Sequence, residues 1–226
     1  TIINYNPRHY PIVKYNYKNN KKKNCDYLIN LKYNILSRDK IIKSYNLDPK
    51  KFYITFYMGG GSDQKIFSKL LINLANNMSN NCNIKLLVIV GLLSKNKNLI
   101  TKLSKKYKCI EAIVGSNNLY YIMKNTKLFI GTSGTAVFET AFLKTPSILF
   151  EMSKNQNTDI FSLEKIGNYF FLNSNDLYLT KKFIKLIFVI VKNYPRFQSF
   201  ISKPEIKIDN MGAERLVNRI FFNLKT

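Results

Sequence analysis

From residue 52 onward, the hydrophobic positions fall into two alternating kinds of segment. Short, continuously apolar runs predict buried strands, and longer runs with apolar residues three or four positions apart predict amphipathic helices. The predicted strands cover 52–58, 84–90, 109–114, 128–130, 147–150 and 169–172. The predicted helices cover 66–78, 99–107, 120–124, 136–143, 159–166, 177–192 and 213–223.

This alternation predicts an α/β fold. Consecutive parallel strands need a crossover connection, which is usually a helix, so the pattern favours a Rossmann-like parallel sheet with helices on both faces. We expect this domain to cover residues 51–226. Residues 1–50 are rich in Tyr, Asn and Lys and contain only short apolar pieces, so we interpret them as a linker or as the remaining edge of another domain.

The composition limits the classes of partner. An apolar fraction of 46% in 226 residues is enough for a core and excludes a disordered chain. Lys and Arg number 36 against 13 Asp and Glu, which gives a net charge of +23 and raises nucleic acid as a partner. Only five of these cations are Arg, the residue best suited to reading bases and phosphates. Lysine-rich compositional drift is therefore the preferred explanation, with an acidic ligand or surface as the main alternative.

Other sequence features point to a cytoplasmic protein. Cys25, Cys82 and Cys109 are widely spaced and odd in number, which fits neither a disulfide framework nor a zinc site. No apolar run is long enough for a membrane-spanning helix, and residues 1–10 lack the apolar segment of a secretory signal. We expect no metal and no cofactor.

The first candidate loop is the glycine run at 59–63, directly after a predicted strand. Ligands of parallel sheets bind beyond the carboxyl ends of the strands. Gly60 and Gly61 would let the backbone approach a phosphate, with a helix N-terminus behind them. Ser62 and Asp63 follow the glycines. Instead of contacting a phosphate, one of them could simply be the N-cap of the next helix.

A second candidate loop follows the strand at 128–130. Thr132, Ser133, Gly134 and Thr135 place hydroxyls and a glycine at the start of a helix, which again suits an anion. Glu139 lies one turn into that helix, where its carboxylate could accept hydrogen bonds from the two vicinal hydroxyls of a ribose. Stabilisation of a solvated Glu139 by the helix dipole is an equally simple explanation.

The third candidate loop contains Asn155 and Gln156, after the strand at 147–150. Side-chain amides there could hydrogen-bond the hydroxyl or acetamido groups of a sugar, or a phosphate. An ordinary polar loop before a helix would have the same composition.

Taken together, these motifs resemble a known family. The matching segments are 57–63 (YMGGGSD), 131–139 (GTSGTAVFE) with Pro146, Asn155-Gln156, 212–215 (GAER), 25–30 (CDYLIN) and 32–38 (KYNILSR). They resemble the carboxyl half of the UDP-2,4-diacetamido-2,4,6-trideoxy-β-L-altropyranose hydrolase of pseudaminic acid biosynthesis. That family is related to spore-coat polysaccharide proteins and, more distantly, to MurG-type glycosyltransferases.

The resemblance implies the nucleotide-binding half of a GT-B architecture and a UDP-sugar as ligand. By it, Gly60, Gly61 and Ser62 and the turn at 133–135 would hold the diphosphate, and Glu139 would hold the ribose. Backbone groups of Val114, Gly115 and the next residue would meet the uracil. Asn155 and Gln156 would face the sugar. The implied reaction is attack of water at the anomeric carbon, with UDP leaving and no metal required.

The sequence leaves three functions open. The family's catalytic histidine belongs to an amino half that has no counterpart here, and His9 does not match its motif. The chain is therefore interpreted as a UDP-sugar hydrolase half that needs a missing amino half or partner chain. A GT-B glycosyltransferase of the MurG type and a catalytically inert UDP-sugar-binding module are the alternatives. Nucleic acid is the least favoured ligand.

Overall fold

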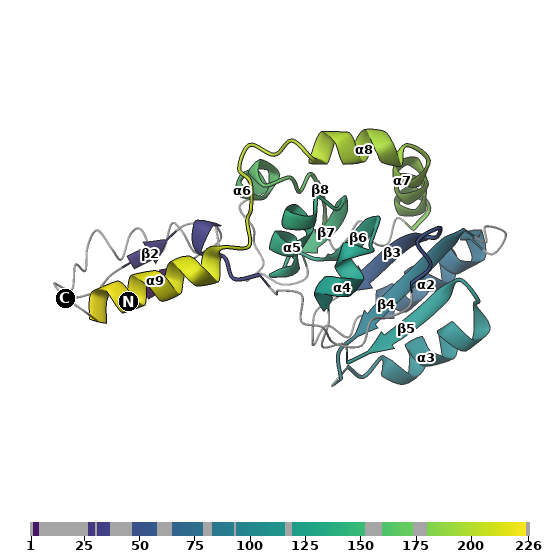
Figure 1. Ribbon diagram of the computed structural model, residues 1–226. Coiled ribbons are helices and arrows are strands. Elements are labelled where there is room, and N and C mark those ends of the chain that lie inside the picture. Colours follow the sequence, from purple (N-terminus) through teal and green to yellow (C-terminus); the bar gives the residue numbers. More distant parts are fainter. Residues whose placement is uncertain are drawn as a thin grey trace.

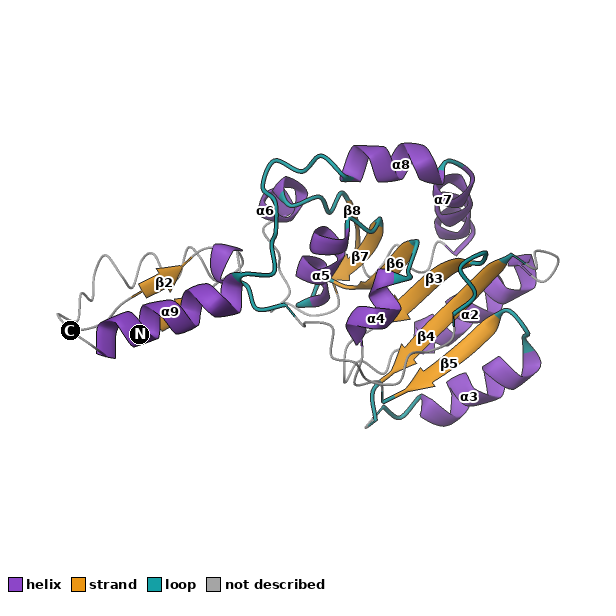
Figure 2. Ribbon diagram, in the orientation of Figure 1, coloured by secondary structure: helices purple, strands orange, loops and turns teal. Residues whose placement is uncertain are grey.

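A computed structural model describes residues 2–4, 27–29, 31–36, 47–57, 65–78, 83–92, 94–115, 119–151, 160–173 and 180–224. Six strands form one sheet in the order β5-β4-β3-β6-β7-β8 (Figures 1 and 2). They are β3 (Phe52–Tyr57), β4 (Ile84–Val90), β5 (Ile110–Val114), β6 (Leu128–Thr132), β7 (Ser147–Glu151) and β8 (Phe170–Asn173). The helices between and after them are α2 (Lys65–Met78), α3 (Lys97–Lys106), α4 (Leu119–Lys124), α5 (Ala136–Leu143), α6 (Ile160–Lys165), α7 (Thr180–Lys192) and α8 (Tyr194–Ile201).

Every neighbouring pair of strands in this sheet is parallel. The chain starts at β3, builds outward through β4 and β5, returns to the other side of β3 as β6, and builds outward again through β7 and β8. This order confirms the predicted Rossmann-like α/β fold.

One face of the sheet is covered by α2, α3 and α7. Strand residues that face this side alternate with residues that face the other, as the two-residue period of a strand requires. The largest apolar cluster joins Ile54 and Phe56 of β3 and Phe150 of β7 to Leu74 of α2 and Ile187 of α7, all 0–1% exposed. Both faces of a parallel sheet are buried, which explains the nearly uninterrupted apolar runs of the sequence.

The opposite face is covered by α4, α5 and α6. Phe129 of β6 and Leu149 of β7 pack there with Val137 and Phe138 of α5 and Leu163 of α6. A smaller cluster beside it joins residues of β3, β4 and β5 to α4. The sheet thus lies between two packed helical layers.

The structure differs from the predicted elements at several boundaries. Strand β6 continues through Gly131 and Thr132, which were expected to form a turn, because both residues pair with β7. An additional helix, α8, follows α7 almost without a break. Pro195 lies in its first turn, where a missing amide proton does no harm, so this proline starts a helix that the sequence analysis had missed.

A separate group of elements stands at one end of the molecule (Figure 1). Strands β1 (Ile2–Asn4) and β2 (Tyr27–Ile29) pair in parallel, and a short 3-10 helix, η2 (Leu31–Tyr33), follows β2. Helix α9 (Gly212–Leu224) runs beside these strands, so the last helix of the chain lies next to its first residues. The first fifty residues therefore include short strands rather than only a linker.

We predict that Phe150→Ala lowers the free energy of unfolding by about 3–5 kcal/mol, because the ring is fully buried and its removal leaves a cavity. The Phe150 ring lies 5.4 Å from that of Phe183, centroid to centroid. Val189 lies on the exposed side of α7, the helix that also carries Phe183. Val189→Ala is therefore the control and should change the free energy of unfolding by less than about 0.5 kcal/mol. Equal urea midpoints for the two variants would contradict this description of the core.

Candidate functional site

The change of direction in the sheet falls between β3 and β6. Chain connections leave β3 toward one side and β6 toward the other, which makes this the topological switch point where open parallel sheets bind ligands. The register pairs Tyr57, the last residue of β3, with Gly131 of β6. Two of the three predicted loops, at 59–63 and 132–135, therefore follow the two strands that border the switch point.

The turn between β6 and α5 is ordered by backbone hydrogen bonds. The Ser133 amide donates to the carbonyl oxygen of Phe150 over 3.0 Å, and the Gly134 amide donates to that of Thr132 over 2.7 Å. Thr132 and Ser133 are buried, whereas Thr135 is exposed. Within the turn, the Ser133 and Gly134 amides thus support the fold, and the exposed Thr135 hydroxyl is the better placed group for an anion.

Helix α5 presents Glu139 in its first turn, partly exposed, on the sheet face that also carries α4. A buried amide holds this helix in place. The Ser147 hydroxyl of β7 and the Thr140 hydroxyl of α5 donate to Oδ1 of Asn168 over 2.7 and 3.1 Å. Asn168 Nδ2 in turn donates to the Val137 carbonyl oxygen over 3.2 Å. The orientation of Glu139 therefore depends on a network that the sequence analysis did not foresee.

Val114 and Gly115 lie at the carboxyl end of β5, two strands away from β3. Gly115 adopts φ +64°, and its amide donates to the Val90 carbonyl oxygen over 2.9 Å. A Cβ atom at this position would meet only the exposed Leu92 side chain, which can move, so the positive φ is what favours glycine here. Gly115 thus keeps the main chain close to β4, at the sheet edge where we predicted backbone contacts to uracil.

Tyr57 was missed by the sequence analysis. Its half-buried side chain packs against clusters formed with α4 and α5. Burial raises the pKa of the Tyr57 phenol, and the nearby Glu139 carboxylate raises it further. The sequence did contain a signal for this residue: a tyrosine ends the strand two positions before the glycine run that begins at Gly59.

Six of the predicted site residues lie outside the described residues. They are Gly60, Gly61, Ser62, Asp63, Asn155 and Gln156. The structure brings Thr132, Ser133, Gly134, Thr135 and Glu139 together around one turn and places Val114 and Gly115 farther along the same sheet edge.

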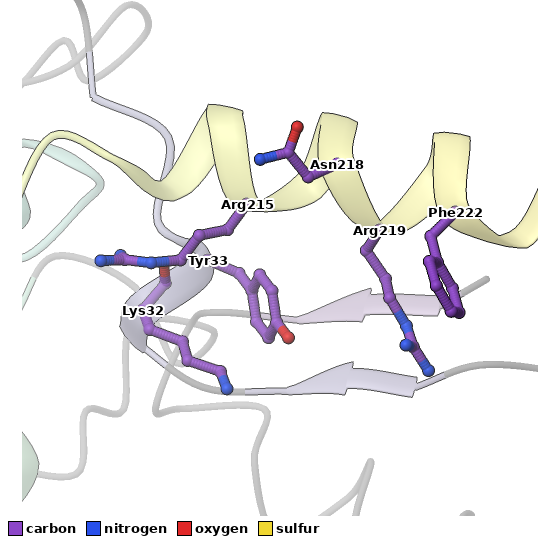
Figure 3. Close-up of a pocket in the computed structure, with 6 residues that line it drawn as sticks. All are labelled: Lys32, Tyr33, Arg215, Asn218, Arg219 and Phe222. Atoms are coloured by element: carbon purple, nitrogen blue, oxygen red, sulfur yellow. The ribbon is translucent and has the colours of Figure 1, made fainter.

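A separate pocket of about 400 Å³ lies between η2 and α9, at the other end of the molecule (Figure 3). It contains none of the predicted site residues and is lined by Lys32, Tyr33, Arg215, Asn218, Arg219 and Phe222. Arg219 lies over the ring of Phe222 at 5.8 Å from the centroid, and Lys32 lies over Tyr33 at 5.1 Å. Its walls are thus largely cation–aromatic pairs.

The 212–215 motif at the start of α9 has an architectural role. A Cβ atom on Gly212 would collide with the Asn34 main chain, so only glycine allows this close approach. Both terminal nitrogens of Arg215 donate to the Asp209 carboxylate over 2.7 Å, and Nη1 also donates to the Lys32 carbonyl oxygen over 3.0 Å. These contacts fix α9 to η2, away from the sheet edge.

Residues 28–156, more than half of the chain, match the family model for lipid-A-disaccharide synthetase. The chain belongs to the lipid-A-disaccharide synthetase family. This match favours the glycosyltransferase alternative over the hydrolase that the motifs resemble. No curated protein matches this chain significantly.

Solved structures share the fold of this lipid-A-disaccharide synthetase family member. S. aureus MnaA with UDP superposes with a TM-score of 0.57 at 15% identity, over 80% of this chain and 50% of that one. UDP-GlcNAc 2-epimerase from Neisseria meningitidis, bound to UDP-GlcNAc, gives 0.56 at 11% identity, over 77% and 46%. The glycotransferase of kitacinnamycin gives 0.63 at 10% identity, over 96% and 69%. The chain spans about half the length of the first two, and the fold is that of one half of a GT-B architecture.

Two kinds of feature are absent from the described part of the chain. No helix there is long and apolar enough to cross a bilayer. Nor do three or more His, Cys, Asp or Glu side chains gather among those residues as they would around a metal ion.

We predict that Asn168→Ala lowers the free energy of unfolding by about 2–4 kcal/mol, because three buried hydrogen bonds are lost. The buried Ser147 hydroxyl loses its acceptor, and the Thr140 hydroxyl and the Val137 carbonyl oxygen keep only their bond to each other. Asn193→Ala is a matched control: its amide is exposed and donates only to the Val189 carbonyl oxygen. The control should cost less than about 1 kcal/mol. Chemical denaturation of both variants measures the difference, and similar losses would show that the buried network is unimportant.

A pH titration tests the clamp at the start of α9. The hydrogen bond from Arg215 lowers the pKa of the Asp209 carboxyl. Because the folded-state pKa lies below the unfolded one, this pair contributes stability above the unfolded pKa and loses it as the pH falls through the folded pKa. NMR should show Asp209 titrating below its ordinary value, and Arg215→Gln should move the midpoint upward. An unmoved midpoint would rule out the clamp in solution.

Proposed function

We propose that this chain is the nucleotide-binding half of a GT-B glycosyltransferase that uses a UDP-sugar. The observation that supports this most directly is the coincidence of two anion-suited loops, at 59–63 and 132–135, with the β3–β6 switch point. Membership in a disaccharide synthetase family supports glycosyl transfer as the reaction class. Two structural relatives, S. aureus MnaA and the Neisseria meningitidis epimerase, have UDP or UDP-GlcNAc bound, which supports uracil as the base.

In this proposal the diphosphate lies over the N-terminus of α5. The Thr135 hydroxyl and the amides that begin the helix would stabilise its charge, together with Gly60, Gly61, Ser62 and Asp63. Glu139 would accept hydrogen bonds from the ribose hydroxyls. Main-chain groups at Val114 and Gly115 would contact the uracil.

The proposed chemistry is transfer of the sugar to an acceptor hydroxyl. A bond forms between the acceptor oxygen and the anomeric carbon while the bond to the UDP oxygen breaks, and the acceptor proton passes to a base. Loops and helix N-termini at the sheet edge would stabilise the negative charge that develops on UDP. Asn155 and Gln156 would contact the sugar. We assign no base among the described residues.

The base and the acceptor site would belong to a second Rossmann-like half, on this polypeptide or another. Helix α9 offers a surface for it. Val217, Ile220 and Phe221 recur at helical spacing on α9 and are 48, 41 and 60% exposed. A stripe of this kind normally packs against another element. In the first two solved relatives the matched part makes up only 50% and 46% of the chain, so both contain additional chain that could form a second half.

Hydrolysis of a UDP-sugar is the second candidate, and the motifs at 57–63 and 131–139 favour it. Transfer and hydrolysis share the nucleotide site and differ in whether an acceptor or water attacks. A UDP-sugar panel incubated with and without candidate acceptors would separate them once the second half is supplied.

Binding of UDP by the unmodified chain tests the proposed nucleotide site directly. Calorimetric titration should show that the chain binds UDP more tightly than UMP, because the second phosphate meets the loops at the switch point. A short oligonucleotide is the control for the +23 charge and should bind only weakly and with strong salt dependence. Binding of the oligonucleotide alone would overturn the proposal.

Replacement of single site residues tests the assignment. We predict that Glu139→Ala weakens UDP binding by roughly tenfold or more, since a hydrogen bond to a charged group contributes about 1.5–3 kcal/mol. Gly61→Val should abolish binding by blocking the backbone approach to phosphate. Lys144→Ala, at the exposed C-terminal end of α5, is a control that should bind normally. Unchanged UDP affinity in Glu139→Ala would remove the ribose assignment.

A further inference from the structure

Tyr57 occupies a central position at the sheet edge. As the last residue of β3, it pairs with Ile89 of β4 on one side and with Gly131 of β6 on the other. A Cβ atom on Gly131 would collide with the Tyr57 carbonyl oxygen, so the two strands that border the switch point are in close contact here. Tyr57 is thus the strand residue nearest to the point where the two candidate loops diverge.

The Tyr57 side chain points to the face of the sheet that α4 and α5 cover. The alternation along β3 sends Ile54 and Phe56 into the core on the α2 side and leaves Tyr57 on the other side. There its ring packs beside Leu119 of α4 and the α5 cluster. The half-buried ring is held between two helices, which fixes the direction of its hydroxyl.

Glu139 lies on the same face, in the first turn of α5. Burial raises the pKa of the Tyr57 phenol most, and the negative charge of the Glu139 carboxylate raises it further. The phenol therefore stays protonated at neutral pH and is available as a hydrogen-bond donor. A carboxylate has about four acceptor positions, so it can accept from a phenol and from two ribose hydroxyls together.

We propose that Tyr57 is a positioning residue for nucleotide recognition: in the complex its hydroxyl donates to the Glu139 carboxylate and holds that carboxylate toward the ribose. This inference rests on the proposed function and deepens it, because it makes discrimination for a ribonucleotide depend on a residue of β3 as well as on α5. The strand at the switch point then contributes a side chain to specificity in addition to the loop that follows it.

The test is Tyr57→Phe, which keeps the packed ring and removes only the hydroxyl. Binding of UDP and of 2′-deoxy-UDP is measured by calorimetry for the unmodified chain, Tyr57→Phe, Glu139→Gln and the double variant. We expect Tyr57→Phe to weaken UDP binding by about five- to tenfold, as loss of one hydrogen bond predicts. We expect a smaller effect on the deoxy analogue, so the preference for UDP should fall. Glu139→Gln keeps an acceptor oxygen but removes the charge that strengthens the bond, so in this background Tyr57→Phe should weaken UDP binding less than it does in the unmodified chain.

Tyr53→Phe is the matched control. Tyr53 lies on the same strand and face but toward the amino end of β3, where its hydroxyl accepts from the Asp48 amide over 2.9 Å. This variant should bind UDP normally, and thermal unfolding of both variants checks that they are folded.

The outcomes separate the inference from the function on which it rests. Normal UDP binding by Tyr57→Phe, an equal loss for UDP and its deoxy analogue, or full additivity with Glu139→Gln would overturn the role of Tyr57 while leaving the proposed function intact. Equal weakening by Tyr53→Phe would also overturn it, by showing a general effect on β3. Failure of the unmodified chain to bind UDP would overturn both.

Discussion

The parallel arrangement of the six strands is the constraint on which the rest of the structure depends. Because every strand runs in the same direction, each connection must cross a face of the sheet, and all carboxyl ends meet at one edge. The chain builds outward from β3 and then again from β6, so its connections separate at the boundary between these strands. This separation brings loops that are some seventy residues apart in sequence to one place, and it gives the candidate site its position.

Close packing then determines the orientation of the groups at that edge. Helix α5 contributes only two turns, yet its buried face fills the cluster around Phe129 and Leu149, and Asn168 links it to β7. A short helix with both apolar packing and a satisfied polar network has little freedom to rotate. Glu139 is therefore presented in a fixed direction beside Tyr57, although neither residue takes part in the Asn168 network.

Helix α9, at the far end of the molecule, is held by a few specific contacts instead of by a large apolar cluster. Gly212 and Arg215 join α9 to η2 by close backbone contact and a charge-assisted clamp, whereas the apolar stripe of α9 stays exposed. This exposed stripe is the surface on which we propose that a second half packs. The basic charge of the protein is carried mostly by lysines that are scattered along the chain.

The sequence by itself determined the fold class and most of the elements, because hydrophobic periodicity is local and both faces of a parallel sheet are buried. It also singled out Glu139 and the glycine and hydroxyl residues from Thr132 to Thr135 as candidates, because such residues between a strand and a helix suit an anion, and their role stays a prediction. Only the tertiary structure decided the strand order, the nearness of Tyr57 to Glu139, the support from Asn168 and the place of α9 beside β1 and β2. Each of these depends on contacts between residues distant in the chain, and a local pattern has no information about which distant partner a side chain meets.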